Sequence, residues 1–381
     1  MPRRVGFALR DAAGVTLEAT LQRLVDDDLA AWPTMPARLL HVLAPGQRID
    51  VEVAAGAADL ATAEPLRPGT RFRIASVTKP FVAAAALRLV EDGRLSLDGT
   101  IRVLLSGDYD ELLRSGGYDT ASISLRHLLT HTSGIYDFAA DAYGRTDDGF
   151  TARVHRDPRH RWTRLEQVRF AVEHGHPYGP PGSMFAYSDT GANLVGEILE
   201  RVTGTSMGAA IRSLIGFERL GIAQTWQETI EPEPADLPPL SHQYEDEMDV
   251  AEMDASVDLY GGGGLMSTCR DVARFFRALG RGEVFEDPMT LRTMTTTLVG
   301  VPLTTEAQWD EDPSTAGMFI FRREIAGEMW WGHTGFWGTT AFTCPARDVT
   351  VVAGHQRSNM PEAFDRLEIV GRAYEALAER Y

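Results

Sequence analysis

Strand-like and helix-like patterns are separated along this chain of 381 residues, and that separation limits the possible folds more than any other feature. The first part contains an amphipathic helix, with apolar residues at helical spacing from Leu17 to Leu29, followed by two β-rich runs joined by a Pro-Gly turn, residues 39–44 and 49–54. The last part contains four short strand-like runs and a closing helix, at residues 318–321, 328–331, 339–343, 349–353 and 364–377. The middle is mostly helical with polar loops.

A single sheet formed by both ends of the chain explains this order best. We therefore predict an α+β fold: an antiparallel β-sheet flanked by N- and C-terminal helices, with an inserted, mostly helical domain. The sheet domain is expected to comprise residues 1–75 and 255–381, and the insertion residues 76–254. We expect an active site between the two parts.

Composition excludes several classes of partner. A formal net charge of −17 disfavours a nucleic-acid backbone or an anionic membrane. No apolar stretch approaches the roughly 20 residues that span a bilayer. Arg10 and Asp11 interrupt what would be the apolar part of a signal peptide, so we expect a cytoplasmic location. Cys269 and Cys344 give no disulfide framework, and each is expected to be a small buried residue.

Lys79 is the only lysine among 37 basic residues, and Ser76 precedes it by three positions at the start of a predicted helix that runs to about Glu91. Residues three apart share a helix face with Cβ atoms roughly 5–6 Å apart, so the hydroxyl and the amine can meet. A serine needs a base to become a nucleophile, and lysine can lose its proton whereas arginine cannot. Because a serine falls three residues before a given lysine by chance about once in twenty, this pair alone does not establish a site.

Two further motifs follow in order along the chain, Tyr187-Ser188-Asp189 and His333-Thr334-Gly335. With Ser76 and Lys79 they resemble the serine β-lactamase-like and penicillin-binding superfamily, in which Ser-x-x-Lys, Tyr-x-Asn and Lys/His-Thr-Gly occur in this order. The similarity is to the branch that includes class C β-lactamases, D-Ala-D-Ala carboxypeptidases, D-aminopeptidases and related esterases. It extends from about residue 56 to 355, and other stretches also look like family segments, at residues 73–80, 125–134 and 263–268.

The resemblance implies a role for each motif residue. Ser76 would be the acylated nucleophile, and Lys79 and Tyr187 its proton-transfer partners. The backbone N–H groups of Ser76 and Phe336 would form an oxyanion hole. The residues expected to bind substrate or edge the oxyanion hole are Asp189, His333, Thr334, Gly335 and Phe336.

Two residues depart from the family pattern. Asp189 stands where the best-studied members have asparagine, and a carboxylate beside Lys79 would hold that lysine as an ammonium. We expect this ammonium to lower the pKa of the Tyr187 phenol, which would make Tyr187 the working base. Phe336 replaces the hydroxyl residue that commonly helps to bind a substrate carboxylate. Neutral esters, amides or amine-bearing peptides are therefore favoured over β-lactams and D-Ala-D-Ala ends.

Several other features invite a functional interpretation. Ser206 is the centre of a Gly-x-Ser-x-Gly pattern, but helical pattern on both sides favours a turn or a helix N-cap. The histidine pairs His155/His160 and His174/His176 lack a third ligand at a recognisable spacing, so we predict no metal. Glycines 261–264 indicate a tight turn, and the acidic stretch 231–258 a solvated loop or a lid. The aromatic residues that flank the third motif are either core or a wall of the pocket: Trp330, Trp331, Phe336 and Trp337.

The sequence thus predicts a serine hydrolase that forms an acyl-enzyme on Ser76 and cleaves a small ester, an amide or a short peptide, without a cofactor. Three alternatives stay open: an acyltransferase or transamidase that uses the same intermediate, a β-lactamase or D-Ala-D-Ala carboxypeptidase, and a sensor that stays acylated. The substrate, the oligomeric state and the choice of Lys79 or Tyr187 as the base also stay open.

Overall fold

The computed structural model describes residues 15–140, 148–304 and 312–380. Arg10 and Asp11, on which the expected location depends, lie outside these ranges, as does part of the loop before residue 150. Within them, no helix is long and apolar enough to cross a membrane. Both cysteines are buried and unpaired, as predicted.

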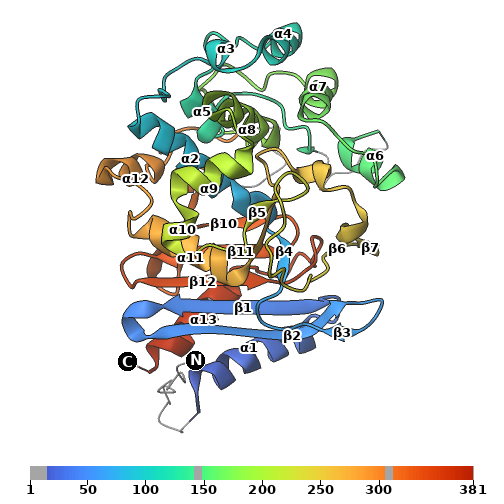
Figure 1. Ribbon diagram of the computed structural model, residues 1–381, viewed down its shortest axis with the longest axis vertical. Coiled ribbons are helices and arrows are strands. Elements are labelled where there is room, and N and C mark those ends of the chain that lie inside the picture. Colours follow the sequence, from blue (N-terminus) through green and yellow to red (C-terminus); the bar gives the residue numbers. More distant parts are fainter. Residues whose placement is uncertain (1–14, 141–147, 305–311, 381) are drawn as a thin grey trace.

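One antiparallel sheet joins the two ends of the chain (Figure 1). The strands lie in the order β3 (Glu64–Pro65), β2 (Ile49–Asp59), β1 (Ala37–Ala44), β12 (Val349–Gly354), β11 (Thr339–Cys344), β10 (Glu328–Gly335) and β9 (Phe321–Ile325). The central pair is β1 with β12, which sets Leu40 opposite Ala353 although more than 300 residues separate them in the chain. This pairing confirms the predicted α+β fold with a sheet from both chain ends.

The two faces of the sheet pack against different layers. Because side chains alternate along a strand, Leu39 and Leu43 of β1 join one apolar cluster, whereas Leu40 and Val42 join another. The second cluster lies under the terminal helices α1 (Leu17–Ala31) and α13 (Glu368–Ala378). The first extends through α11 (Cys269–Gly280) into the helical part of the molecule.

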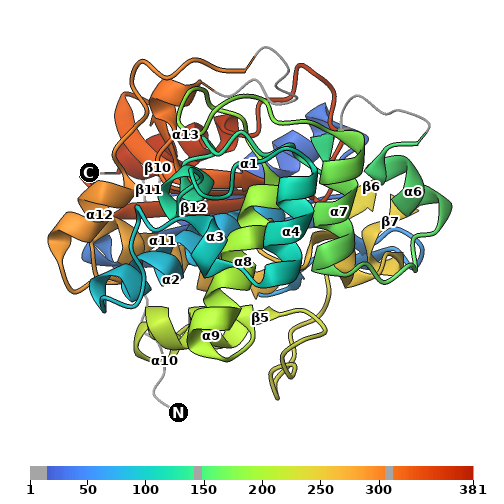
Figure 2. The ribbon, with the colours of Figure 1, turned by 90° about the horizontal axis from the view of Figure 1, so that it is seen from above.

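The helical part lies above α11 and the sheet in Figure 1. Figure 2 shows the molecule from above, with the helical part nearest the reader. At its centre α2 (Lys79–Glu91) packs against α8 (Asp189–Thr203) and α9 (Met207–Ile215). Further helices surround these: α3 (Ile101–Leu104), α4 (Gly107–Ser115), α5 (Leu125–Leu129), α6 (Phe150–Arg156), α7 (Arg164–His174), α10 (Phe217–Leu220) and α12 (Pro288–Met294). The division into two domains at residues 75/76 and 254/255 stays a prediction.

Small sheets connect the two parts. Strand β8 (Leu265–Thr268) pairs with β4 (Arg71–Arg73) and β5 (Trp226–Gln227), and β6 (Tyr244–Glu245) forms a hairpin with β7 (Met248–Asp249). This hairpin lies in the stretch expected to be a solvated loop. That interpretation was wrong for the middle of the stretch, where Gln243, Tyr244 and Glu245 are buried.

One predicted strand was misplaced. Residues 318–320 are buried, but β9 begins only at Phe321. Phe319 has a left-handed φ of 52°, and its N–H donates to the carbonyl of Leu129 in the helical part. The apolar run therefore fills the space between the layers instead of extending the sheet. Phe364, expected on the closing helix, likewise lies before α13.

Candidate active site

Ser76 lies at a sharp turn between the small sheet and the central helix. Ala75 has a φ of 49°, and residues Ala75–Thr78 form a 3₁₀ turn before α2 begins at Lys79. The α-helix predicted from Ser76 therefore starts three residues late. The tighter turn still places Lys79 Nζ 2.9 Å from Ser76 Oγ, because the backbone N–H of Lys79 donates to the Ser76 carbonyl.

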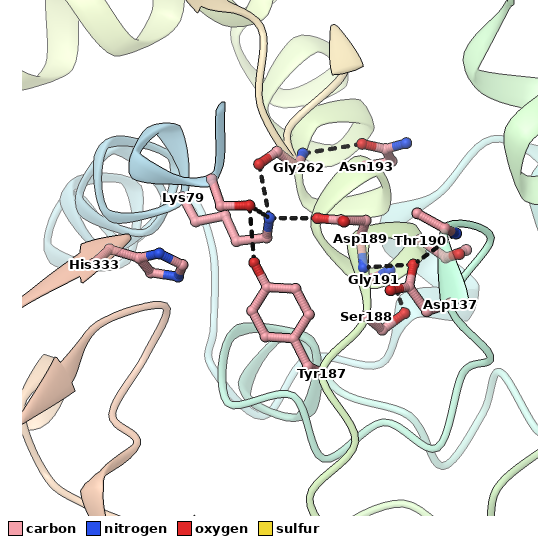
Figure 3. A network of polar contacts seen from close by, with 12 residues as sticks. Lys79, Asp137, Tyr187, Ser188, Asp189, Thr190, Gly191, Asn193, Gly262 and His333 are labelled. Atoms are coloured by element: carbon pink, nitrogen blue, oxygen red, sulfur yellow. Dashed lines mark hydrogen bonds and ion pairs between the residues drawn. The ribbon is translucent and has the colours of Figure 1, made fainter. Parts of the chain in front are cut away.

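Lys79 is fully buried and points toward three oxygen acceptors (Figure 3). Its Nζ donates to Ser76 Oγ at 2.9 Å, to the Gly262 carbonyl at 2.7 Å and to the Asp189 carboxylate. An ammonium carries three N–H donors, so every donor has a partner. This arrangement fits an ammonium whose charge is balanced by Asp189.

Tyr187 reaches the same serine from the segment that precedes α8. Its Oη lies 3.0 Å from Ser76 Oγ, and Lys79 Nζ lies 4.9 Å from the centre of its ring. The sequence led us to expect a lowered pKa for this phenol. In the structure the pKa of Tyr187 is raised well above its usual value, first by burial and then by the negative charge of Asp189. Tyr187 is therefore a neutral phenol at neutral pH.

The third motif forms the end of β10. His333 is buried, and its Nδ1 donates to the Thr334 carbonyl at 2.6 Å. Burial and the charge of Lys79 lower the pKa of His333 to about 3, so this imidazole is neutral. Gly335 lies so close to the turn before Ser76 that a Cβ here would come within 2.5 Å of the Ile74 carbonyl. This close approach sets the end of β10 against the turn that contains Ser76, and the oxyanion hole itself stays a prediction.

Seven of the eight predicted site residues line one pocket, and Lys79 lies behind its wall. Besides these seven, the carboxyl groups of Glu245 and Asp258 face this pocket, together with one arginine, Arg366. The remaining lining is mostly apolar: Phe138, Ala139, Phe150, Thr151, Val154, Val257 and Trp337. The pocket therefore exposes the Ser76 hydroxyl, with Lys79 and Tyr187 as neighbours that can carry protons. Its apolar lining suits a ligand with an apolar group.

The predicted aromatic wall is correct for two of its four residues. Phe336 and Trp337 line the pocket. Trp330 instead packs edge-on against Tyr374 under the sheet, and Trp331 packs on the cluster above it. Adjacent residues on a strand face opposite sides, so Trp330 and Trp331 cannot share one wall. Phe138 and Phe150 of the helical part complete the aromatic lining.

Comparison with known proteins places this geometry in a family. The family model described as Beta-lactamase matches residues 36–374. The chain belongs to the beta-lactamase family. Esterase EstB of Burkholderia gladioli is 34% identical over 192 residues, which cover 49% of this chain and 45% of the esterase. Penicillin-binding protein 4* of Bacillus subtilis is 27% identical over 59% of this chain and 48% of that protein. The chain thus spans about half the length of these curated relatives.

Solved structures of this beta-lactamase-family fold cover nearly the whole chain. The D-stereospecific amidohydrolase from Streptomyces sp. is 25% identical with a TM-score of 0.74, over 94% of this chain and 98% of that one. The D-amino acid amidase from Ochrobactrum anthropi SV3, complexed with L-phenylalanine amide, is 25% identical with a TM-score of 0.74, over 95% and 98% of the two chains. These structures share the sheet, flanking helices and helical part described above.

A glycine loop belongs to this beta-lactamase-family site, although we predicted only a tight turn for it. Gly262 supplies the carbonyl that accepts from Lys79. A Cβ on Gly262 would come within 2.7 Å of Asp189 Oδ1, and one on Gly263 within 2.2 Å of Asp258 Oδ2. The glycines therefore let a backbone loop approach two carboxyl groups and a lysine. The run of four glycines was the available signal, since it indicates close backbone approach as well as a turn.

Two further carboxyl groups of the family site were not predicted. Asp137 is buried, and its Oδ1 accepts from the backbone N–H of Asp189 at 3.1 Å. Burial and the charge of Asp189 raise the pKa of Asp137 to about 8. The same two causes raise the pKa of Asp258 to about 7. Nothing in the local sequence distinguishes these two residues from the chain's other acidic residues.

The remaining candidates lie apart from the site or have structural partners. Ser206 is the N-cap of α9, as predicted, and accepts from the N–H of Ala209 at 3.3 Å. His155 lies 3.1 Å from Glu245, at the edge of the pocket. In the ranges that the structure describes, no three His, Cys, Asp or Glu side chains are grouped to hold a metal ion.

Proposed function

We propose that this chain is a serine hydrolase that forms an acyl-enzyme on Ser76 from a small ester or amide. The observation that carries the proposal is the meeting of three groups at the pocket wall: Ser76 Oγ lies 2.9 Å from Lys79 Nζ and 3.0 Å from Tyr187 Oη. A serine with two proton-carrying partners in a pocket meets the requirements for nucleophilic catalysis. Membership of the family and the esterase and amidase relatives support the same reaction class.

In the acylation step, Ser76 Oγ attacks the substrate carbonyl carbon and the carbonyl oxygen becomes an oxyanion. The backbone N–H groups of Ser76 and Phe336 are proposed to donate to that oxygen. Because Tyr187 is a neutral phenol, we propose that it accepts the serine proton as it passes its own proton to the leaving group. The bond to the leaving group then breaks, and water repeats the sequence in reverse to release the acid.

Lys79 supplies charge in this scheme. Its ammonium, held by Asp189 and the Gly262 carbonyl, lies beside the serine oxygen and favours the negative charge that develops there. Since the phenol exchanges one proton for another, no phenolate has to form in the buried site. The raised pKa of Tyr187 therefore does not obstruct the reaction.

The pocket lining favours neutral or amine-bearing substrates. Two carboxyl groups of the described pocket lining already have a partner: Asp189 is paired with Lys79, and Glu245 lies 3.1 Å from His155. The buried carboxyl of Asp258 would accept a hydrogen bond from an ammonium on the substrate, while the aromatic lining suits an apolar side chain. Amides and esters of aromatic amino acids meet both conditions, in agreement with the D-amino acid amidase fold relatives.

The proposal is tested by intact-mass measurement after incubation with p-nitrophenyl esters, D- and L-phenylalanine amides, and a β-lactam. We expect one acyl adduct per chain, located on Ser76 by peptide mapping, and steady turnover after the initial burst. The adduct should be absent in Ser76→Ala. If Ser76→Ala turned over these substrates as fast as the wild type, the proposal would be wrong.

The same experiment separates the alternatives. A stoichiometric burst without turnover would indicate a sensor that stays acylated. Faster release of p-nitrophenol on addition of an amine, with formation of the corresponding amide, would indicate acyl transfer. Preference for the β-lactam would contradict the selectivity that we propose from the carboxyl groups and Phe336.

A further inference from the structure

Residues 131–138, which we call the supporting segment, contact the Tyr187-Ser188-Asp189 motif along its length. The carbonyl of His131 accepts from the N–H of Ala186 at 2.8 Å, and its Nδ1 accepts from the N–H of Ser188 at 3.1 Å. At the other end, Asp137 Oδ1 accepts from the N–H of Asp189 at 3.1 Å. The segment has no part in the chemistry proposed above, although it accepts hydrogen bonds from the backbone N–H groups of Ala186, Ser188 and Asp189.

His131 also fixes the direction of the Tyr187 ring. The two rings are stacked, with centroids 4.4 Å apart and planes 24° apart. His131 is 2% exposed, and burial and the charge of Lys79 hold its pKa well below the usual value. A neutral imidazole whose Nδ1 accepts carries its proton on Nε2. Histidine therefore supplies a flat ring and a hydrogen-bond acceptor together, which neither phenylalanine nor asparagine can do.

Asp137 has the corresponding role for Asp189. Its Oδ1 accepts from Ala139 and Asp189, both at 3.1 Å, while its Oδ2 has no hydrogen-bond partner among the described residues. The bond to Asp189 fixes the first turn of α8, and this turn directs the Asp189 carboxylate at Lys79. Figure 3 shows Asp137 beside the backbone of Asp189, joined to it by this hydrogen bond.

We propose that His131 and Asp137 are positioning residues of the hydrolytic site: His131 aims the Tyr187 phenol at Ser76, and Asp137 holds the Asp189 carboxylate against Lys79. The inference rests on the proposed function, because positioning has meaning only if Ser76 is acylated. Neither residue lies among those that line the pocket, so their loss should affect the rate of acylation and not the binding of substrate. Displacement of a reacting group by about 1 Å can lower a rate about 10²-fold.

The test compares variants in p-nitrophenyl ester turnover, with kcat, KM and melting temperature measured for each. Asp137→Ala and His131→Ala should lower kcat by about 10²-fold and leave KM within about threefold. Asp137→Asn keeps an oxygen acceptor and should retain kcat within about threefold. Ser133→Ala is the matched control, since Ser133 is buried in the same segment but, among the described residues, its hydroxyl bonds only to the N–H of Ile135. It should also retain kcat.

Full kcat in Asp137→Ala, or an equal loss in Ser133→Ala, would overturn the inference. If Asp137→Ala failed to fold, His131→Phe decides, because it keeps an aromatic ring and removes the acceptor for Ser188, while the Nε2–H that it also removes has no partner among the described residues. We expect kcat to fall about tenfold at constant KM, and a wild-type kcat would overturn the inference. These results are distinct from failure of the proposed function, which would appear as a wild type that forms no adduct on Ser76.

Discussion

Ser76 and Ser206 both occupy sequence patterns typical of nucleophilic serines, Ser-x-x-Lys and Gly-x-Ser-x-Gly. Their hydroxyl groups have different partners in the structure. Ser76 Oγ meets Lys79 Nζ and Tyr187 Oη, the second from a residue 111 positions away. Ser206 Oγ accepts from the backbone N–H of Ala209 in its own helix. The difference shows that a motif of this length specifies a local backbone shape, whereas the chemistry depends on side chains brought from distant segments.

The largest expected effect comes from removing the Ser76 hydroxyl. Ser76→Ala should lower kcat/KM for an ester by about 10⁴-fold or more, because loss of a nucleophile removes the covalent route. Intact-mass spectrometry should find no adduct. An adduct that persisted in Ser76→Ala and mapped to Ser206 would show that Ser206 is the nucleophile and that the assignment of Ser76 is wrong.

The next effect concerns the lysine that Ser206 lacks. Lys79→Arg should lower kcat by about 10³-fold, because a planar guanidinium cannot bond to the same three acceptors in a fully buried space. Circular dichroism and melting temperature identify any loss of folding. A folded Lys79→Arg variant with wild-type kcat would show that any positive charge beside Ser76 is enough for its reactivity.

Tyr187→Phe removes only the partner that reaches Ser76 from a distant segment. The ring can keep its stacking on His131, so the melting temperature should change little. We expect kcat to fall by about 10²–10⁴-fold, the range typical of proton transfer by a positioned group, with KM nearly constant. An unchanged kcat would mean that Ser76 and Lys79 carry out the acylation without proton transfer by Tyr187.

The strands and helices that depend on a local pattern of apolar residues were predicted from the sequence. Strands near residues 39–44, 339–343 and 349–353 alternate toward two apolar layers, and they form the centre of the sheet. The strand at 318–321 was misplaced because a left-handed Phe319 cannot be recognised from an apolar run. Within the candidate site, the side chains of the three motifs were found. The Gly262 carbonyl was missed because a backbone group has no identity in a sequence, and Asp137 because its contact with Asp189 spans 52 residues.

A smaller effect tests the charges near Ser76. The pKa of Asp258 is raised from 3.8 to about 7, chiefly by burial. Between about pH 4 and 7 the folded chain keeps a proton that the unfolded chain releases, so this group makes the fold less stable as pH rises through that window. Asp258→Asn should therefore gain stability relative to the wild type by about 2–3 kcal/mol between pH 5 and pH 8. Melting temperatures measure this gain, and Asp236→Asn, at an exposed carboxyl, should show none.

The smallest effect is expected at Ser206, and it completes the comparison. Ser206→Ala removes an N-cap acceptor from α9, which should lower the free energy of unfolding by about 0.5–2 kcal/mol. Turnover at 25 °C and the adduct on Ser76 should be those of the wild type, because the Ser206 hydroxyl bonds within its own helix. Ser206→Asp, which supplies another N-cap acceptor, should restore most of the stability. A lower kcat in Ser206→Ala that Ser206→Asp did not restore would contradict this prediction. The Ser206 hydroxyl would then contribute to turnover as well as to the N-terminus of α9.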